Sequence, residues 1–136
     1  MTTRQQLPIL AASICVRRGP EVLLIQRGKE PGLGKWAFPG GQVIFGETTR
    51  QAALRELKEE ASIEADLGDM IGLYEVIYPA FHFAIACYVG FNPTGILRAA
   101  SDAADARWVN VDFISQLPLA ANIAATVAAS EHLMRA

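Results

Sequence analysis

The stretch GGQVIFGETTRQAALRELKEEASI, from Gly40 to Ile63, carries the most informative pattern in this sequence. A glycine pair opens it, and a run with helical periodicity follows. Three glutamates, Glu56, Glu59 and Glu60, crowd within five residues of that run. Glu56 and Glu60 are a like-charge pair at i, i+4 spacing, which destabilises an isolated helix. The stretch therefore predicts a helix that gathers negative charge on one face.

The expected helix runs from residue 48 to residue 61. Thr48 is the predicted N-cap, and Gln51 stands at the position that completes a capping box. Arg55 can pair with Glu59 at i+4, whereas Lys58 points away from the acidic face. Apolar residues at helical spacing predict the buried stripe, which consists of Ala53, Leu54, Leu57 and Ala61.

A bound cation explains an acidic face that repels itself. Carboxylate oxygens are hard ligands of the kind that Mg²⁺ and Mn²⁺ prefer. The plainer alternative is a solvated charged face, which is common on helices. The glycine pair and Glu47 argue against that alternative, because a loop followed by a helix N-terminus lets backbone N–H groups face a ligand near the acids.

The same stretch resembles the Nudix box, which reads G, five residues, E, seven residues, then R-E-U-x-E-E-x-G-U, where U is a bulky apolar residue. The matching positions are Gly41, Glu47, Arg55, Glu56, Leu57, Glu59, Glu60 and Ile63. One position departs from the pattern, since Ser62 stands where the family has glycine. That glycine ends the helix, so we expect an altered C-cap and retained chemistry. The preceding residues 35–41, KWAFPGG, also resemble the strand that leads into the box.

The resemblance implies an α/β fold, a Nudix-type α/β/α sandwich with a mixed β-sheet. It also implies Mg²⁺- or Mn²⁺-dependent hydrolysis of a nucleoside diphosphate linked to another group. The implied metal-site residues are Gly41, Glu56, Glu59 and Glu60, and the implied catalytic residues are Glu47, Arg55, Glu59 and Glu60. In the family, the arginine orients a glutamate, and the residue matching Glu47 caps or orients the helix.

The general base varies within the family and can be a glutamate of the box or an acid from a later loop. The later acids here are Asp102 and Asp105, with Glu75 as a more distant candidate. For each of the three, a solvated acid is the plainer interpretation.

Cationic and aromatic residues outside the box are candidates for contact with a nucleotide. They are Arg27, Lys35, Phe45, Tyr78 and Phe81. The basic side chains can meet phosphates and the aromatic rings can stack on a base, although core packing is the alternative for the rings.

Two features after the box favour ADP-ribose as the substrate, cleaved to AMP and ribose 5-phosphate. Pro79 follows the box at the distance seen in ADP-ribose-cleaving members, and residues 101–109, SDAADARWV, resemble the same members. A nucleoside triphosphate pyrophosphatase is the alternative, and a non-catalytic nucleotide-binding module is a third interpretation, disfavoured because all three acids remain. Hydrolysis of RNA caps or diphosphoinositol phosphates predicts a more basic chain than 12 Lys and Arg against 14 Asp and Glu.

The composition predicts one globular domain over residues 1–136. It is 51% hydrophobic and 19% charged with a net charge of −2, which favours neither nucleic acid nor membrane as a partner. Cys15 and Cys87 lie in apolar stretches and are expected to be buried thiols. The N-terminal residues do not form a long apolar run, so we expect a cytoplasmic protein. A monomer or a homodimer is expected, and the alanine-rich residues 120–130 either pack on the sheet or form a dimer contact.

Hydrophobic patterning predicts strands and helices around the box. The expected strands are residues 9–18, 21–27, 67–79, 81–91 and 107–111, with loops at 28–36 and 92–106. The expected helical segments are residues 111–117 and 120–134.

Overall fold

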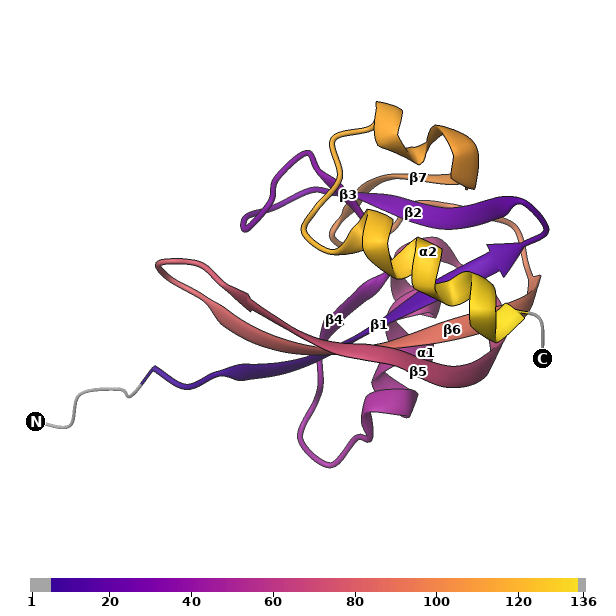
Figure 1. Cartoon of the computed structure of the whole chain (residues 1–136). Helices are drawn as coiled ribbons and strands as arrows, with labels where there is room; N and C mark the ends of the chain where they lie inside the picture. Colours follow the sequence, from indigo (N-terminus) through magenta and orange to yellow (C-terminus); the bar gives the residue numbers. More distant parts are fainter. Residues whose placement is uncertain (1–5, 135–136) are drawn as a thin grey trace, which may run out of the picture.

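The computed structural model describes residues 6–134, which form a mixed β-sheet with helices on both faces (Figure 1). The sheet has seven strands: β1 (Ile9–Arg18), β2 (Glu21–Arg27), β3 (Trp36–Ala37), β4 (Gly40–Gln42), β5 (Glu64–Ile77), β6 (His82–Thr94) and β7 (Ala103–Asn110). The helices are α1 (Thr49–Ala61), the 3₁₀ helix η1 (Val111–Gln116) and α2 (Ile123–Met134). The predicted α/β/α sandwich with a mixed sheet is confirmed.

The strand order is β3-β2-β1-β6-β5, with β4 paired to β1 and β7 paired to β2. The central pair β1 and β6 is parallel, in register from Ile9 opposite Phe83 to Val16 opposite Gly90. The other pairs are antiparallel. The start of β1 and the β5–β6 hairpin project together to one side of the molecule (Figure 1).

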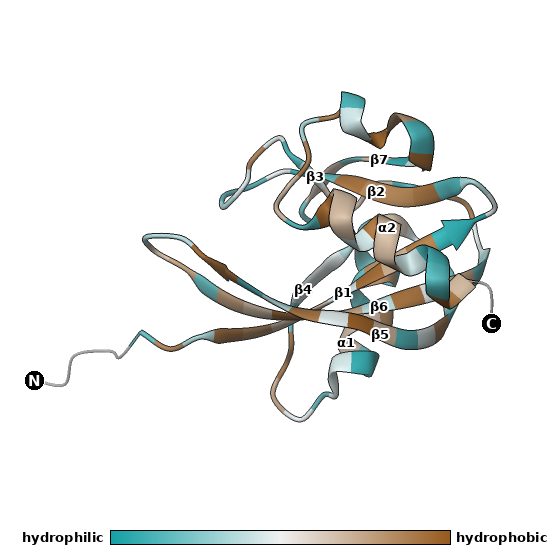
Figure 2. Cartoon of the chain, in the orientation of Figure 1, coloured by the Kyte–Doolittle hydropathy of each residue, from teal (hydrophilic) through white to brown (hydrophobic). Residues whose placement is uncertain are grey.

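Alternation along β1 builds two cores, because successive side chains of a strand point to opposite faces. Ala12, Ile14 and Val16 are buried against α1. Cys15 faces the other layer and packs with residues of η1 and α2. Figure 2 follows this pattern, with hydrophobic segments concentrated along the central strands. Cys15 and Cys87 are both buried free thiols, as predicted.

Helix α1 begins as the sequence predicts. The Thr48 side chain accepts a hydrogen bond from the Gln51 backbone N–H, and the Gln51 side chain accepts one from the Thr48 backbone N–H. The predicted stripe is wrong at Leu54, which is 37% exposed, whereas Ala52 is fully buried in its place. The helix is rotated so that the small alanines, which allow close approach, face the sheet.

The C-terminus of α1 is capped by a residue other than glycine. Ser62 adopts a left-handed conformation with φ of 61° and donates its backbone N–H to the Lys58 carbonyl. The expected alteration of the C-cap is not seen in the backbone, because Ser62 adopts the left-handed conformation that glycine favours and the helix still ends there. Lys58 itself points away from the acidic face and pairs with Glu64 at 2.8 Å.

Several element boundaries differ from the sequence prediction. Strand β5 begins three residues early, at Glu64, and β6 continues to Thr94. Residues 103–106 were expected in a loop but belong to β7, which pairs with β2 as far as Arg27 opposite Ala103. The alanine and aspartate residues in that segment have weak strand preference, so its conformation comes from pairing with β2.

The C-terminal helix packs on the sheet. Residues 120–122 precede α2, which buries Ile123, Thr126, Val127 and Ser130. Arg17 of β1 is 5% exposed; it donates a 2.9 Å hydrogen bond to Ser130 Oγ and pairs with Glu131 at 2.7 Å. The predicted packing of this helix on the sheet is confirmed. Within residues 6–134, no helix is both long and apolar enough to cross a membrane.

Candidate functional site

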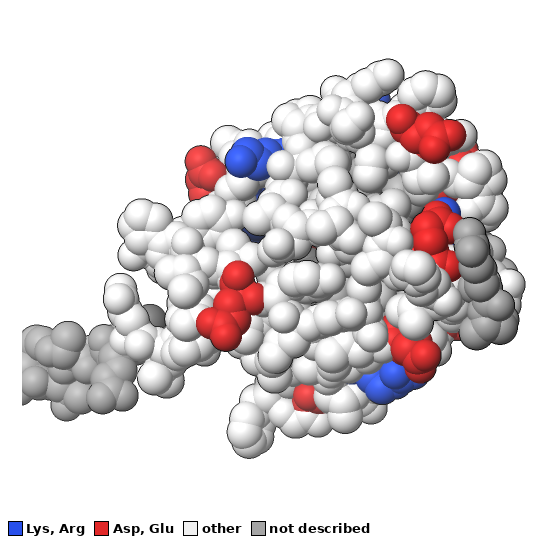
Figure 3. Space-filling view, in the orientation of Figure 1, with Lys and Arg blue, Asp and Glu red and all other residues white. Residues whose placement is uncertain are grey.

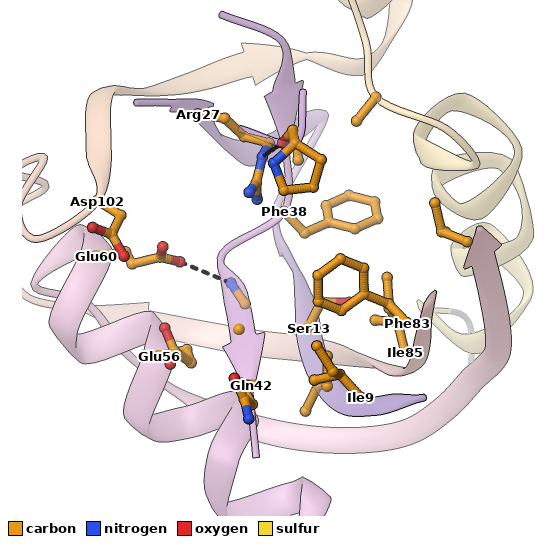
Figure 4. A pocket seen from close by; sticks show the side chains of 18 of the residues that line it. Ile9, Ser13, Arg27, Phe38, Gln42, Glu56, Glu60, Phe83, Ile85 and Asp102 are labelled. Atoms are coloured by element: carbon orange, nitrogen blue, oxygen red, sulfur yellow. Dashed lines mark hydrogen bonds between the residues drawn. The ribbon is translucent and has the colours of Figure 1, made fainter. Parts of the chain in front are cut away.

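A cavity of about 810 Å³ lies between the acidic face of α1 and the face of β1, β6 and β5 that α2 leaves uncovered. Carboxylates from α1 and from the loop before β7 line one half. Apolar and aromatic side chains from β1, β5 and β6 line the other half (Figure 4). One cavity thus joins a strongly charged region to an apolar one.

The segment between η1 and α2 bounds the apolar half and is held by β3. The Trp36 N–H donates to the Pro118 carbonyl at 2.8 Å, and the Ala120 N–H donates to the Trp36 carbonyl at 2.9 Å. Ala120, Ala121 and Ile123 line the cavity beyond these bonds.

Two carboxylates of α1 are buried at this cavity. Glu60 is 6% exposed and accepts a 2.8 Å hydrogen bond from the Gly40 N–H, which Figure 4 marks with a dashed line. The Glu56 side chain is 13% exposed and lies one helical turn away. Helical periodicity puts them on one face, as the sequence predicts.

Burial raises the pKa of the Glu60 carboxyl from its ordinary 4.5 to about 7. The hydrogen bond from Gly40 opposes this rise in pKa, whereas the charges of Glu56 and Asp102 add to it. Burial likewise raises the pKa of Glu56, against the opposing effect of Arg55. Loss of solvation is thus the main cause for both acids, and the charges of Arg55 and Arg27 offset it only in part.

Arg55 organises the acids on the outer side of the cluster. It donates to both oxygens of Glu47, at 2.7 and 2.9 Å, and its Nη1 lies 2.8 Å from Glu56 and 3.1 Å from Glu59. The predicted Arg55–Glu59 pair is confirmed, and the contacts with Glu47 and Glu56 extend it. The hydrogen bonds from Arg55 and from the Ile44 N–H lower the pKa of Glu47 to about 2.

The backbone at Gly41 closely approaches an acid. A Cβ at this position would lie 2.7 Å from the Glu56 carboxyl carbon. Gly40 is the more constrained position, because a Cβ there would lie 2.6 Å from the Ala12 carbonyl oxygen, a backbone atom that cannot move aside as a glutamate side chain can. The glycine pair therefore allows β4 to lie between β1 and the acidic face of α1.

The structure brings one of the three later acids into the cavity. Asp102 lines it and forms a 2.9 Å ion pair with Lys29. Its backbone carbonyl accepts from the Gly28 N–H at 3.0 Å, which joins the two loops. Asp105 instead bonds to Arg107, and Glu75 lies 3.5 Å from His82, so neither lines the cavity.

Four of the five candidates for substrate contact line the cavity, namely Arg27, Phe45, Tyr78 and Phe81. Lys35 does not: it is exposed and directly precedes β3, where its carbonyl accepts from the Arg27 N–H at 2.8 Å. Glu59 also lies outside the cavity lining, and its half-exposed carboxylate is held towards Arg55.

Sequence reasoning missed Phe38, Phe83 and Ile85, which line the apolar half. The signal for two of them is present, since residues 81, 83 and 85 alternate along β6 and therefore share one face. Phe38 carries no local signal, because its place depends on the turn between β3 and β4.

The donor set fits a hard divalent cation in its chemistry, since the cavity offers carboxylate oxygens of Glu56 and Glu60 whose pKa values are raised chiefly by burial. Across the described part of the chain, no three carboxylate, imidazole or thiol groups already converge as metal ligands. The reason is visible in the hydrogen bonds: Glu56 and Glu59 turn towards Arg55, and Glu60 turns towards Gly40.

The sequence model of the NUDIX domain matches residues 7–129. The chain is 30% identical over 112 residues to an ADP-ribose pyrophosphatase of Methanocaldococcus jannaschii, covering 81% of this chain and 66% of that one. It is 52% identical over 59 residues to a putative 8-oxo-dGTP diphosphatase 2 of Mycobacterium tuberculosis, covering 40% of this chain and 42% of that one. The chain thus spans less than two thirds of the length of either relative.

A crystal structure of a MutT NUDIX hydrolase from Burkholderia pseudomallei has the same fold. It superposes with a TM-score of 0.80 at 27% identity, over 93% of this chain and 98% of that one.

Proposed function

The chain belongs to the NUDIX family, and on that premise we propose that it hydrolyses the phosphoanhydride bond of a nucleoside diphosphate linked to a second group. The preferred substrate in this proposal is ADP-ribose, which takes up one water and gives AMP and ribose 5-phosphate.

The observation that carries the proposal is the division of the cavity into two halves. A pyrophosphate is highly charged and needs neutralisation, whereas a nucleobase is flat and largely apolar on its faces. The acidic half, with Glu56 and Glu60, can bind the pyrophosphate through a cation. The apolar half, with its aromatic rings, can bind the nucleobase. One ligand that spans both halves therefore has the character of a nucleotide.

In this proposal the residues that hold Mg²⁺ or Mn²⁺ are Glu56, Glu59, Glu60 and the backbone at Gly41, with Asp102 beside them. When bound, the cation supplies neutralisation of the phosphate oxygens and activation of the attacking water. Glu59 reaches the site by rotation of its side chain away from Arg55. Arg55 and Glu47 are positioning residues, since they hold the loop against the first turns of α1.

Asp102 is the proposed general base. It enters the cavity from the loop before β7, and Figure 4 draws its carboxylate beside that of Glu60. Its ion pair with Lys29 limits its rotation. From this position its carboxylate can accept a proton from a water that attacks phosphorus on that side.

The balance of charge in the cavity favours a diphosphate over a triphosphate. Of the basic residues that line it, Lys29 is paired with Asp102, and Arg55 is shared among three glutamates. Arg27 has no carboxylate within ion-pair distance in the described range, so it is the cation left for a phosphate. Similarity to the archaeal ADP-ribose pyrophosphatase over 81% of this chain supports the same choice.

Nucleoside triphosphate hydrolysis is the second candidate. It is supported by the 52% identity to the mycobacterial putative 8-oxo-dGTP diphosphatase 2, which is confined to 59 residues. A non-catalytic nucleotide-binding module is disfavoured because the acids at positions 56, 59 and 60 are all present.

The test is kcat/KM for ADP-ribose against dGTP, 8-oxo-dGTP, CTP, NADH and diadenosine polyphosphates at one Mg²⁺ concentration. We expect ADP-ribose to have the highest value. A triphosphate preferred by tenfold, about 1.4 kcal/mol in transition-state stabilisation, would contradict the ADP-ribose assignment and leave pyrophosphohydrolysis standing. Binding of nucleotides with no turnover of any of them would support the non-catalytic module instead.

A further inference from the structure

The apolar half of the cavity has few groups that can read the edge of a nucleobase. Among the described uncharged residues that line the cavity, only Ser13, Gln42 and Tyr78 have polar side chains. Gln42 lies near Glu56, at the boundary with the acidic half, as Figure 4 shows. Tyr78 lies at the turn between β5 and β6, where its N–H donates to the Phe81 carbonyl. Within residues 6–134, Ser13 is the one uncharged polar side chain that β1 and β6 contribute to this half, and Tyr78 adds a hydroxyl at its edge.

The backbone beneath the apolar half is also largely occupied. Strand β1 is paired on one side with β4 and on the other with β6. Strand β6 is in turn paired with β5 from Phe83 opposite Val76 to Tyr88 opposite Met70. Backbone N–H and C=O groups used within a sheet are not free to bond a ligand in the cavity.

Aromatic rings supply most of the remaining surface. Phe81 and Phe83 are stacked, with ring centroids 5.7 Å apart and an angle of 9° between the planes. Phe83 and Phe38 extend into the same part of the cavity from β6 and from the turn after β3 (Figure 4). Such rings attract any flat base, because every base has a π-face.

We propose that this half binds the nucleobase through its face and not through its edge, so that the site accepts purine and pyrimidine nucleotides alike. The inference rests on the proposed function for the location of the base. An apolar pocket separates close analogues by only about 10- to 200-fold, whereas a site that hydrogen-bonds the base edge separates them by about 10⁴-fold or more. Selection of the substrate then lies with the pyrophosphate and the second group.

The test is equilibrium binding of AMP, GMP, CMP and UMP in buffer with Mg²⁺, with ribose 5-phosphate as the ligand that lacks a base. We expect the four dissociation constants to lie within about 100-fold of one another, and ribose 5-phosphate to bind more weakly than all four. A single base favoured by more than about 10⁴-fold would overturn the proposal, because it requires edge recognition. Equal affinity for AMP and ribose 5-phosphate would also overturn it.

Variants of Phe81 and Phe83 test whether the base binds through its face. Phe83→Leu keeps an apolar side chain but removes the ring, and it should weaken all four nucleotides by a similar factor of about 5- to 100-fold. Phe81→Leu is the second variant, because Phe81 is 36% exposed and tolerates change with less risk to folding. Phe113→Leu is the matched control, since Phe113 is exposed on η1 outside the cavity lining. Loss of affinity for one base only would overturn the proposal. Unchanged affinities in folded Phe83→Leu and Phe81→Leu proteins would also overturn it.

The binding assay does not depend on turnover. If the substrate panel shows no hydrolysis but the four nucleotides bind as expected, base-face binding stands and the proposed reaction fails. If ADP-ribose is hydrolysed but one base dominates binding, the proposed reaction stands and base-face binding fails.

Discussion

Arg55 of α1 forms a two-pronged contact with Glu47 of the preceding loop, Nε to Oε2 at 2.7 Å and Nη2 to Oε1 at 2.9 Å. The same guanidinium also bonds Glu56 and Glu59 through Nη1. A planar group with five N–H donors can satisfy three carboxylates at once, which an ammonium cannot do in this geometry. The pair thus ties the loop to the acidic face of the helix.

Arg55→Lys should lower both activity and stability, although the charge is kept. The variant loses the paired bonds to Glu47, and we expect the free energy of unfolding to fall by about 1–3 kcal/mol and kcat/KM to fall by at least tenfold. Urea unfolding and initial rates measure the two effects. Arg50→Lys, on an exposed position of the same helix, is the control. An Arg55→Lys protein that matches wild type in both would mean that charge alone suffices.

Glu47 should contribute to stability in a pH-dependent way. Its pKa is lowered in the folded protein to about 2, from an ordinary 4.5. A lowered folded-state pKa gives stability that is present above pH 4.5 and is lost as the pH falls towards 2. The difference in unfolding free energy between wild type and Glu47→Gln should therefore be constant from pH 7 to about pH 5 and shrink as the pH falls from 4.5 to 3. A difference that stays constant across this range would contradict the assigned contact with Arg55.

Glu60→Gln should abolish turnover and stabilise the metal-free protein. Glutamine keeps an oxygen that can accept the Gly40 N–H, while it removes a buried charge that repels Glu56. We expect a higher melting temperature than wild type in chelator at neutral pH and a rate lower by orders of magnitude in Mg²⁺. Glu64→Gln, an exposed acid paired with Lys58, is the control for loss of one negative charge. A lower melting temperature in chelator would show that the Glu60 charge is satisfied without a cation.

Mg²⁺ should stabilise the wild-type fold as well as support activity. A ligand that binds only the native state raises stability by RT ln(1 + [L]/Kd), about 2.7 kcal/mol at 100 times Kd. We expect the melting temperature to rise with Mg²⁺ in wild type and to rise much less in Glu56→Gln and Glu60→Gln. Activity should vanish in excess chelator. Full turnover in chelator would contradict the proposal that these acids bind a catalytic cation.

Asp102 should be the one later acid whose loss slows the reaction. Asp102→Asn should lower kcat by about 10²- to 10⁴-fold, the range for general-base catalysis, with a smaller change in KM. Asp105→Asn and Glu75→Gln are the matched controls, because both acids lie outside the cavity and should leave kcat unchanged. Similar rates for all three variants would move the base to a glutamate of α1.

Local sequence determined helix α1, its capping box and the acidic face. These features depend on residues three or four positions apart, so the helical period decides them without the rest of the chain. The strands at Ile9–Arg18 and Glu21–Arg27 were predicted to the residue for a similar reason, since apolar runs bounded by a Gly-Pro turn leave little choice. Spacing within residues 41–63 was likewise enough to indicate the family.

Tertiary structure decided which of these residues meet. Leu54 is exposed because α1 rotates to bring its alanines onto the sheet, and residues 103–106 form a strand because β2 offers them a partner. Asp102 reaches Glu60 through pairing of distant loops, while Asp105 points away. Phe38 and Phe83 line the same apolar half of the cavity although they are far apart in the chain. Such contacts arise from long-range strand pairing and close packing, which no local periodicity encodes.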